Sequence, residues 1–512
     1  MSNNFGLQVV DQLFDYPFVK DSVQILPYDF AKSRMVLPLD EVDGKLILAI
    51  ADPLDLEALE EVRLRTKKPI KEVIAERDLL ESAIEQCYHQ SESDTSKIVD
   101  SLIENRLEET AEDDGDGYDL LAQKNSGSAV IRMLNAILME AIQQGASDVH
   151  FEPLESMLSV RYRIDGVLQL RHQPPKEYQS QLLTRIKVMA RLDIAEQRLP
   201  QDGRIKLKMG GRQIDFRVST IPVVYGERIV LRILDKSNVL LGLDKIGMRS
   251  GVLEKFLSLI QMSEGIVLVT GPTGSGKTTT LYSALAQINS SHTNIMTIED
   301  PVEYKLQGMA QIGVNPKIDL TFSTGLRHIL RQDPDVIMIG EIRDKETAEI
   351  AIQAALTGHL VLSTLHTNDA PSALTRLVDM GIEPYLLSSS VIGVLAQRLV
   401  RCICPHCKTS YKPTDTELHD LGLTRGDMEF FTGKGCSECF DTGYKSRRGI
   451  YELMPMSGPI KRKLVDSPDS VGLQKVALEE GMRSLRKDGG ALVARGITTT
   501  AEALRVTRGS EE

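Results

Sequence analysis

The chain has 512 residues, of which 42% are hydrophobic and 26% charged, an ordinary composition for a soluble globular protein of about three or more domains. No apolar run approaches the roughly 18–20 residues that span a bilayer, and the first residues lack the basic and apolar regions of a signal peptide, so we expect a cytoplasmic location. The net charge is −12, but residues 91–119 alone carry eleven acidic and two basic side chains. The rest is nearly neutral, which argues against the broad basic surface of a nucleic-acid motor.

Residues 1–90 are predicted to form a small α/β module. The apolar run at 46–51 predicts a strand, and the spacing of apolar residues in 56–66 predicts a helix. No chemical motif occurs here, so we interpret this module as a docking domain. The acidic residues 91–127 combine charge with Gly and Ser, which predicts a flexible linker.

Residues 128–238 are predicted to form an α+β domain. An apolar helical face begins at Val130, and alternating residues at 158–164 precede the hairpin turn Asp165-Gly166. A second hairpin turns at Gly210-Gly211. Arg217 and Arg232 alternate with apolar neighbours and therefore point to a polar face. Spacing alone favours ordinary solvated arginines, with an arginine finger as the alternative.

The most specific motif of the chain fits the phosphate-binding loop G-x-x-x-x-G-K-[ST]. It comprises Gly271, Pro272, Thr273, Gly274, Ser275, Gly276, Lys277 and Thr278. An apolar strand pattern precedes it and a helical pattern follows, which is the context that such a loop requires. Lys277 is predicted to reach the β- and γ-phosphates of ATP, and Thr278 to bind Mg²⁺.

Carboxylates follow two further apolar strands of the same region. Glu299, Asp300 and Glu303 follow the first, and Glu341 follows the second after Gly340, which replaces the usual Walker B Asp. Such groups gather at the carboxyl ends of parallel strands, so both clusters are candidates to face the phosphates. Ordinary surface carboxylates at helix starts are the alternative.

Two histidines, His359 and His366, flank the apolar strand at 360–365. Near a phosphate they are candidates to sense or contact it. A packed core histidine is the alternative for each.

Two C-x₂-C pairs predict a structural Zn²⁺ site. The ligands are Cys404, Cys407, Cys436 and Cys439. The spacing between the pairs requires a separate loop or short helix, Cys402 is an additional thiol, and His406 is a competing ligand. These features divide the third region into an ATPase core at 242–399, a zinc-binding insert at 400–445 and a helical region at 446–512.

Taken together, the motifs resemble one family, the hexameric ATPases of type II secretion and type IV pilus systems. The matching segments include 145–153, 199–204, the loop at 271–278, 297–304, 331–344, 357–367 and the tetracysteine insert. The resemblance implies a RecA-like core and a PAS-like second domain. It also implies that Glu303 is the general base, that Glu341 binds Mg²⁺ through water, and that Arg217 and Arg232 reach the nucleotide. His359 and His366 match the two histidines of the family.

Within this family, the chain length, the compact N-terminal module and the tetracysteine insert resemble the type II secretion ATPases most. This implies an ATP-hydrolysing homohexamer that powers pseudopilus assembly. Its partners would be inner-membrane platform proteins, including the cytoplasmic part of a bitopic protein. Association with the inner membrane would be peripheral and with its anionic surface indirect, and no nucleic-acid partner is expected. Type IV pilus assembly is the alternative, and nucleic-acid translocation a more distant one.

Overall fold

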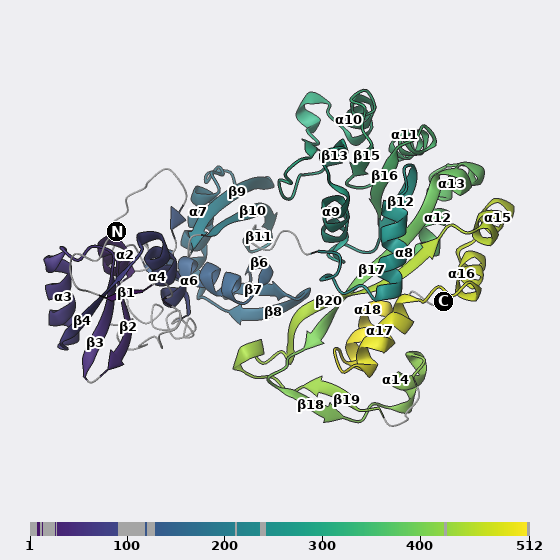
Figure 1. Ribbon diagram of the computed structural model, residues 1–512. Helices are drawn as coiled ribbons and strands as arrows, with labels where there is room; N and C mark the ends of the chain where they lie inside the picture. The colour runs from purple at the N-terminus through teal and green to yellow at the C-terminus, as the bar shows by residue number, and fades with distance from the viewer. Residues whose placement is uncertain are drawn as a thin grey trace. The chain divides into compact units, whose positions relative to one another are not determined.

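A computed structural model describes residues 8–10, 13, 26, 28–42, 44–90, 118–119, 129–209, 212–235, 242–423 and 428–508. The chain divides into two compact units, residues 1–237 and 238–512, and both mix helices with sheets, which confirms the predicted α/β class (Figure 1). The acidic linker predicted at 91–127 lies outside the described residues except for β5, Tyr118–Asp119. Among the described helices, none combines the length and hydrophobicity needed to cross a bilayer.

The N-terminal part of the first unit contains a four-stranded sheet in the order β1-β4-β3-β2. The strand and the helix predicted here are both present, and the Asp55 carboxylate caps the helix by accepting a hydrogen bond from the Ala58 N–H. The elements are β1 Gln8–Val10, α2 Tyr28–Arg34, β2 Val36–Val42, β3 Lys45–Ile50, α3 Leu56–Thr66, β4 Ile70–Ala75 and α4 Arg77–Gln90.

The remainder of the first unit is built on a seven-stranded sheet in the order β5-β9-β10-β11-β6-β7-β8. Every described pair is antiparallel except β5 with β9. Both predicted hairpins occur as strand pairs, although Gly210 and Gly211 lie outside the described residues. The elements are α6 Ala129–Gln143, β6 Ala146–Pro153, β7 Leu158–Ile164, β8 Val167–His172, α7 Gln179–Met189, β9 Gln201–Met209, β10 Arg212–Val223 and β11 Gly226–Asp235.

The second unit contains a seven-stranded sheet in the order β14-β13-β15-β16-β12-β17-β20. Six strands are parallel, as predicted, and β20 is an antiparallel edge strand. The strands are β12 Gly265–Thr270, β13 Ile295–Glu299, β14 Ala310–Gly313, β15 Val336–Ile339, β16 Leu360–Leu365, β17 Val391–Ile403 and β20 Tyr444–Pro455.

Helices cover both faces of this sheet, which is why its central strands are apolar at nearly every position. Val267 and Val269 of β12 pack with helices α8 and α9, whereas Ile266 and Leu268 pack on the other face with α10 to α13 and the C-terminal helices. The helices are α8 Ser250–Ile260, α9 Lys277–Ile288, α10 Phe322–Ile329, α11 Lys345–Leu356, α12 Ala370–Asp379 and α13 Pro384–Ser390.

The strands β17 and β20 frame the tetracysteine segment. Between the two C-x₂-C pairs lie β18 Lys408–Tyr411, α14 Asp415–Asp420 and β19 Phe430–Gly433, so the long spacing forms its own small substructure. The chain continues as the predicted helical region with α15 Gly458–Asp466, α16 Ser470–Glu479, α17 Leu485–Ala494 and α18 Thr500–Thr507.

Candidate functional site

The phosphate-binding loop lies between the carboxyl end of β12 and the start of α9. Thr270, the last residue of β12, pairs with Leu365 of β16 on one side and Ala396 of β17 on the other. The loop therefore begins between His366 and Gln397. A helix N-terminus that follows such a loop directs backbone N–H groups and positive potential toward a bound phosphate.

Three glycines of the loop are required by the conformation of its backbone, and two of them also by the close approach of Gln397. Gly271, Gly274 and Gly276 have φ angles of +149°, +79° and +88°, a region that other residues rarely adopt. A Cβ at Gly271 would also lie 2.4 Å from the Gln397 carbonyl oxygen, and one at Gly276 would lie 2.8 Å from the Gln397 side-chain nitrogen. The Ser275 hydroxyl, buried in the same loop, has no hydrogen-bond partner among the described residues, which suits a cradle for a polar ligand.

Lys277 is buried against its own loop. Its Nζ donates hydrogen bonds to the carbonyl oxygens of Gly271 at 2.7 Å and Pro272 at 3.1 Å. Burial lowers the pKa of Lys277 to about 8, although the negative charge of Glu341 acts in the opposite direction. A phosphate beside Nζ would stabilise the charged form further, so the site is suited to an anionic ligand.

Glu341, two residues beyond the end of β15 and directly after Gly340, forms the acidic side of the site. Its carboxylate accepts hydrogen bonds from Arg343 Nη2 at 2.5 Å and His366 Nε2 at 3.2 Å. Burial alone would raise the pKa of Glu341, but the hydrogen bond and charge of Arg343 and the contact with His366 outweigh it and lower the pKa. The carboxylate is therefore ionised at neutral pH and available to organise a hydrated Mg²⁺.

Gly340 precedes Glu341 where the neighbouring strand approaches closely. Its N–H donates to Ile298 O at 2.8 Å, and a Cβ would lie 3.3 Å from both Ile298 O and the Cα of Glu299. The acid of this strand is therefore displaced by one residue from the usual Walker B position.

Of the carboxylates at and after the end of β13, Glu299 is a structural residue. It is buried and accepts hydrogen bonds from Tyr282, from Thr297 at 2.6 Å and from Gln311 at 3.1 Å. The Tyr282 hydroxyl in turn accepts from the Glu303 N–H at 3.3 Å. Tyr282 belongs to α9, so this network attaches the segment that carries Glu303 to the helix that follows the phosphate loop.

The two predicted histidines lie at opposite ends of the central strand β16. His366 is at the carboxyl edge beside the phosphate loop, but His359 precedes β16, where its Nδ1 contacts Ala354 O at 2.8 Å. At about 3.3 Å per strand residue, roughly 20 Å separate them. Within this chain His359 does not lie near the phosphate loop. The strands β12 and β16 are parallel, so only the carboxyl end of β16, which leads into His366, is next to the loop that follows β12.

Arg217 and Arg232 pair with each other across β10 and β11. The same row continues to Arg204 of β9 on one side, and to Asp148 of β6 and Arg163 of β7 on the other. Asp148 Oδ1 accepts from Arg232 Nε at 3.0 Å, and Asp148 Oδ2 lies 3.6 Å from Arg163 Nε. Four arginines thus lie in one row with a buried aspartate, and two of them, Arg232 and Arg163, pair with it.

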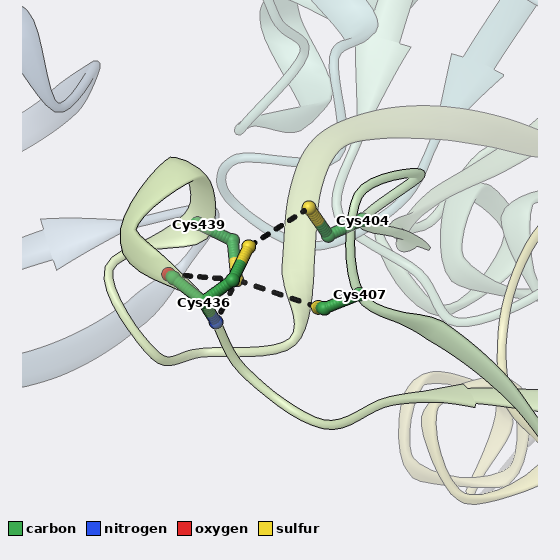
Figure 2. A group of neighbouring side chains, drawn as sticks. All are labelled: Cys404, Cys407, Cys436 and Cys439. Atoms are coloured by element: carbon green, nitrogen blue, oxygen red, sulfur yellow. Dashed lines mark hydrogen bonds between the residues drawn. The ribbon is translucent and has the colours of Figure 1, made fainter.

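The four predicted cysteines form a single cluster (Figure 2). Their sulfur atoms all lie within 4.8 Å of one another, and three of the separations are 3.9, 3.8 and 3.7 Å. Four thiolates at about 2.3 Å around Zn²⁺ would place the sulfurs about 3.8 Å apart, so the donor set fits a tetrahedral zinc ion. The backbone N–H groups of Cys436 and Gly443 donate to Cys439 Sγ, each at 3.3 Å, and orient that ligand. His406 and Cys402 lie outside this cluster.

The threonines before and at the start of α18 attach the cysteine insert to the ATPase sheet. Thr498 donates to Arg401 O of β17 at 2.7 Å, the Thr499 hydroxyl lies 2.8 Å from the Tyr444 hydroxyl, and Thr500 donates to Glu417 of α14 at 2.9 Å. Glu502 of α18 is buried and binds Arg401 Nη2 at 2.9 Å. A zinc ion in this cluster would stabilise the cysteine insert, which is hydrogen-bonded through α18 to β17, the strand next to the phosphate loop.

A phosphate loop, an offset Walker B acid and a parallel sheet covered on both faces define the class of P-loop ATPases with a RecA-like core. Solved structures agree at the level of the fold. The DotB ATPase of Legionella pneumophila has a TM-score of 0.55 and 20% identity over 78% of this chain and 98% of that chain, and the DotB ATPase of Yersinia pseudotuberculosis has a TM-score of 0.55 and 22% identity over 73% and 93%.

Residues 123–505 match the type II/IV secretion system protein family, and residues 5–94 match the MshEN domain. The chain belongs to this secretion family. It is 48% identical to type II secretion system protein HxcR of Pseudomonas aeruginosa over 95% of this chain and all of that protein. It is 44% identical to type II secretion system ATPase E of Vibrio cholerae over 96% and 99%, and 43% identical to the type IV pilus assembly ATPase PilB of Myxococcus xanthus over 98% and 89%.

Arg204 and Asp148 lie within the matching segments 199–204 and 145–153 but were given no role from the sequence, and Gln397 was not identified. A signal for Arg204 was present, because a two-residue turn at Gly210-Gly211 places Arg204 opposite Arg217. No comparable local signal pointed to Asp148 or Gln397, whose partners are 84 and 117 residues away in the sequence.

Proposed function

We propose that this protein hydrolyses ATP to ADP and phosphate and uses the energy to drive type II protein secretion. The observation that supports this most directly is the row of groups at one edge of the sheet, where Lys277, Glu341 and His366 come from three different strand ends. Nearly full-length similarity to proteins named for type II secretion supports the biological role.

Each group of this edge has a proposed task. The loop and Lys277 bind and orient the phosphates, and the Thr278 hydroxyl and Glu341 hold Mg²⁺, which would neutralise phosphate charge. Glu303 accepts a proton from the attacking water. Arg217 and Arg232 contact the developing negative charge on the phosphates from the first unit.

We propose the domain boundaries inferred from the sequence. They fall after residues 90, 127, 238, 399 and 445 and separate the docking module, the linker, the α+β domain, the ATPase core, the zinc-binding insert and the helical region.

The assembly that we propose is a homohexamer peripheral to the inner membrane, at its cytoplasmic face. Residues 1–90 would dock on the cytoplasmic part of a bitopic platform protein, and a polytopic platform protein would receive the motion. The tetracysteine insert would hold one structural Zn²⁺. Co-purification of the full chain with its membrane partners, with and without residues 1–90, tests the docking: equal recovery of the partners would contradict it.

The catalytic proposal is tested by phosphate release from the purified full chain and by secretion in a strain lacking the native copy. Glu341→Gln should reduce the turnover number by about 10²-fold or more, because it removes the carboxylate beside Mg²⁺. Glu349→Gln is a matched control, since Glu349 is an exposed carboxylate of α11 with a surface lysine partner. Unchanged turnover in Glu341→Gln would refute the assigned site. Restored pilus assembly without secretion would favour the type IV alternative.

A further inference from the structure

Gln397 of β17 lies against the phosphate loop, although more than 100 residues of sequence separate the two. Gln397 follows Ala396, the partner of Thr270, and is 2% exposed. The Gln397 carbonyl oxygen occupies the space that a Cβ atom at position 271 would need. Its side-chain nitrogen occupies the space that a Cβ atom at position 276 would need. Gln397 therefore contacts both the first and the sixth residues of the loop.

Gln397 also holds the first turns of the helix that follows. Its Oε1 accepts a hydrogen bond from Thr280 Oγ1 at 2.7 Å, and Thr280 is fully buried. The Thr280 N–H donates to Gly276 O at 3.1 Å, so the pair is attached directly to the end of the loop. Lys277 and Thr278 lie between these two anchor points.

The strand that presents Gln397 is itself anchored on its other face. The next residue, Arg398, donates from Nη1 to Val506 O of α18 at 2.6 Å and from Nη2 to Asn368 Oδ1 at 3.0 Å. Asn368 belongs to the segment that follows His366. A buried side chain on a fixed strand is a stable reference against which a glycine-rich loop can be held.

We propose that Gln397 is a positioning residue for ATP binding: through Thr280 and the close approach to Gly276 it fixes the conformation of the phosphate loop and thereby the positions of Lys277 and Thr278. The inference rests on the proposed binding of ATP by this loop. A glycine-rich loop has many accessible conformations when unsupported, and restricting them in advance lowers the cost of ordering it around phosphates.

The prediction concerns affinity more than turnover. Thr280→Val keeps the shape of the side chain and removes the hydroxyl, so the Kd for a fluorescent ATP analogue and the KM for ATP should both rise about tenfold, while kcat at saturating ATP changes less than threefold. Thr280→Ser restores the hydroxyl and should recover most of the affinity. Gln397→Leu should weaken binding similarly, and the double variant Thr280→Val with Gln397→Leu should be no weaker than either single variant.

Thr498→Val is the matched control. Thr498 is equally buried and its hydroxyl donates to β17 as well, but at Arg401, toward the cysteine insert. This variant should lose a similar amount of thermal stability and bind ATP as the wild type does. Wild-type affinity in Thr280→Val and Gln397→Leu would overturn the inference while leaving ATP hydrolysis intact, and so would an equal loss of affinity in Thr498→Val. Failure of the wild-type chain to bind the analogue would contradict the proposed function as well.

Discussion

Glu502 forms a buried electrostatic link between α18 and β17, the strand that runs from the phosphate loop to the cysteine insert. Its fully buried carboxylate accepts hydrogen bonds from Arg401 Nη2 at 2.9 Å, from the Arg401 N–H at 3.1 Å and from Arg505 Nη2 at 2.7 Å. Burial alone would raise its pKa, but the two arginines lower it from 4.5 to about 2. A shift of this size corresponds to about 3 kcal/mol in favour of the charged form.

We expect Glu502→Gln to lose about this amount of local stability. The amide keeps the shape, and both arginines retain some contact with solvent, with exposed side-chain fractions of 17% and 50%, so no charge is left fully buried. Hydrogen exchange followed by mass spectrometry suits a chain of several domains, because it reports local opening without assuming two-state unfolding. Exchange in peptides covering 399–404 and 500–507 should accelerate about 10²-fold.

The control for this prediction is Glu438→Gln in the cysteine insert. Glu438 pairs with Lys445 at 2.9 Å, but both side chains are about half exposed, so the change should be less than about 1 kcal/mol. The pH dependence supplies a second check. Because the folded-state pKa of Glu502 is depressed, its contribution is complete above about pH 4.5 and is lost as the pH falls toward 2. The difference in Tm between wild type and Glu502→Gln should therefore be constant at pH 5–8 and shrink below pH 4.5. Equal exchange in the two proteins would refute this account of the link.

Three further predictions follow from the other sites. Because burial lowers the pKa of Lys277 to about 8, the KM for ATP should rise as the pH passes 8, whereas Lys277→Arg, which stays charged, should show a flat KM over the same range. Asp148→Asn removes the charge that holds Arg232, so kcat/KM for ATP should fall about tenfold. A kcat/KM equal to that of the exposed control Glu155→Gln would argue against a role of Asp148 in positioning Arg232. Cys439→Ser should abolish stoichiometric zinc measured by atomic emission, and Cys402→Ser should retain it, since Cys402 lies outside the cluster; retention in both would exclude the proposed ligand set.

The sequence by itself determined the features whose partners are close along the chain. The phosphate loop needs eight consecutive residues between a strand and a helix, and each C-x₂-C pair positions two ligands within one turn, so both could be recognised locally. Alternation also placed Arg217 and Arg232 on a polar face, because side chains of a strand alternate between its two faces.

The tertiary structure decided which of these features meet. The register of the parallel sheet brings Glu341 and His366 to the phosphate loop and leaves His359 at the far edge, a separation that two histidines flanking one apolar run did not reveal. The register of the antiparallel sheet aligns Arg204 and Asp148 with the predicted arginines. Gln397 reaches the loop across a strand pair formed by distant segments. Such contacts depend on which strands become neighbours, and that is fixed by packing of the whole sheet and not by local sequence.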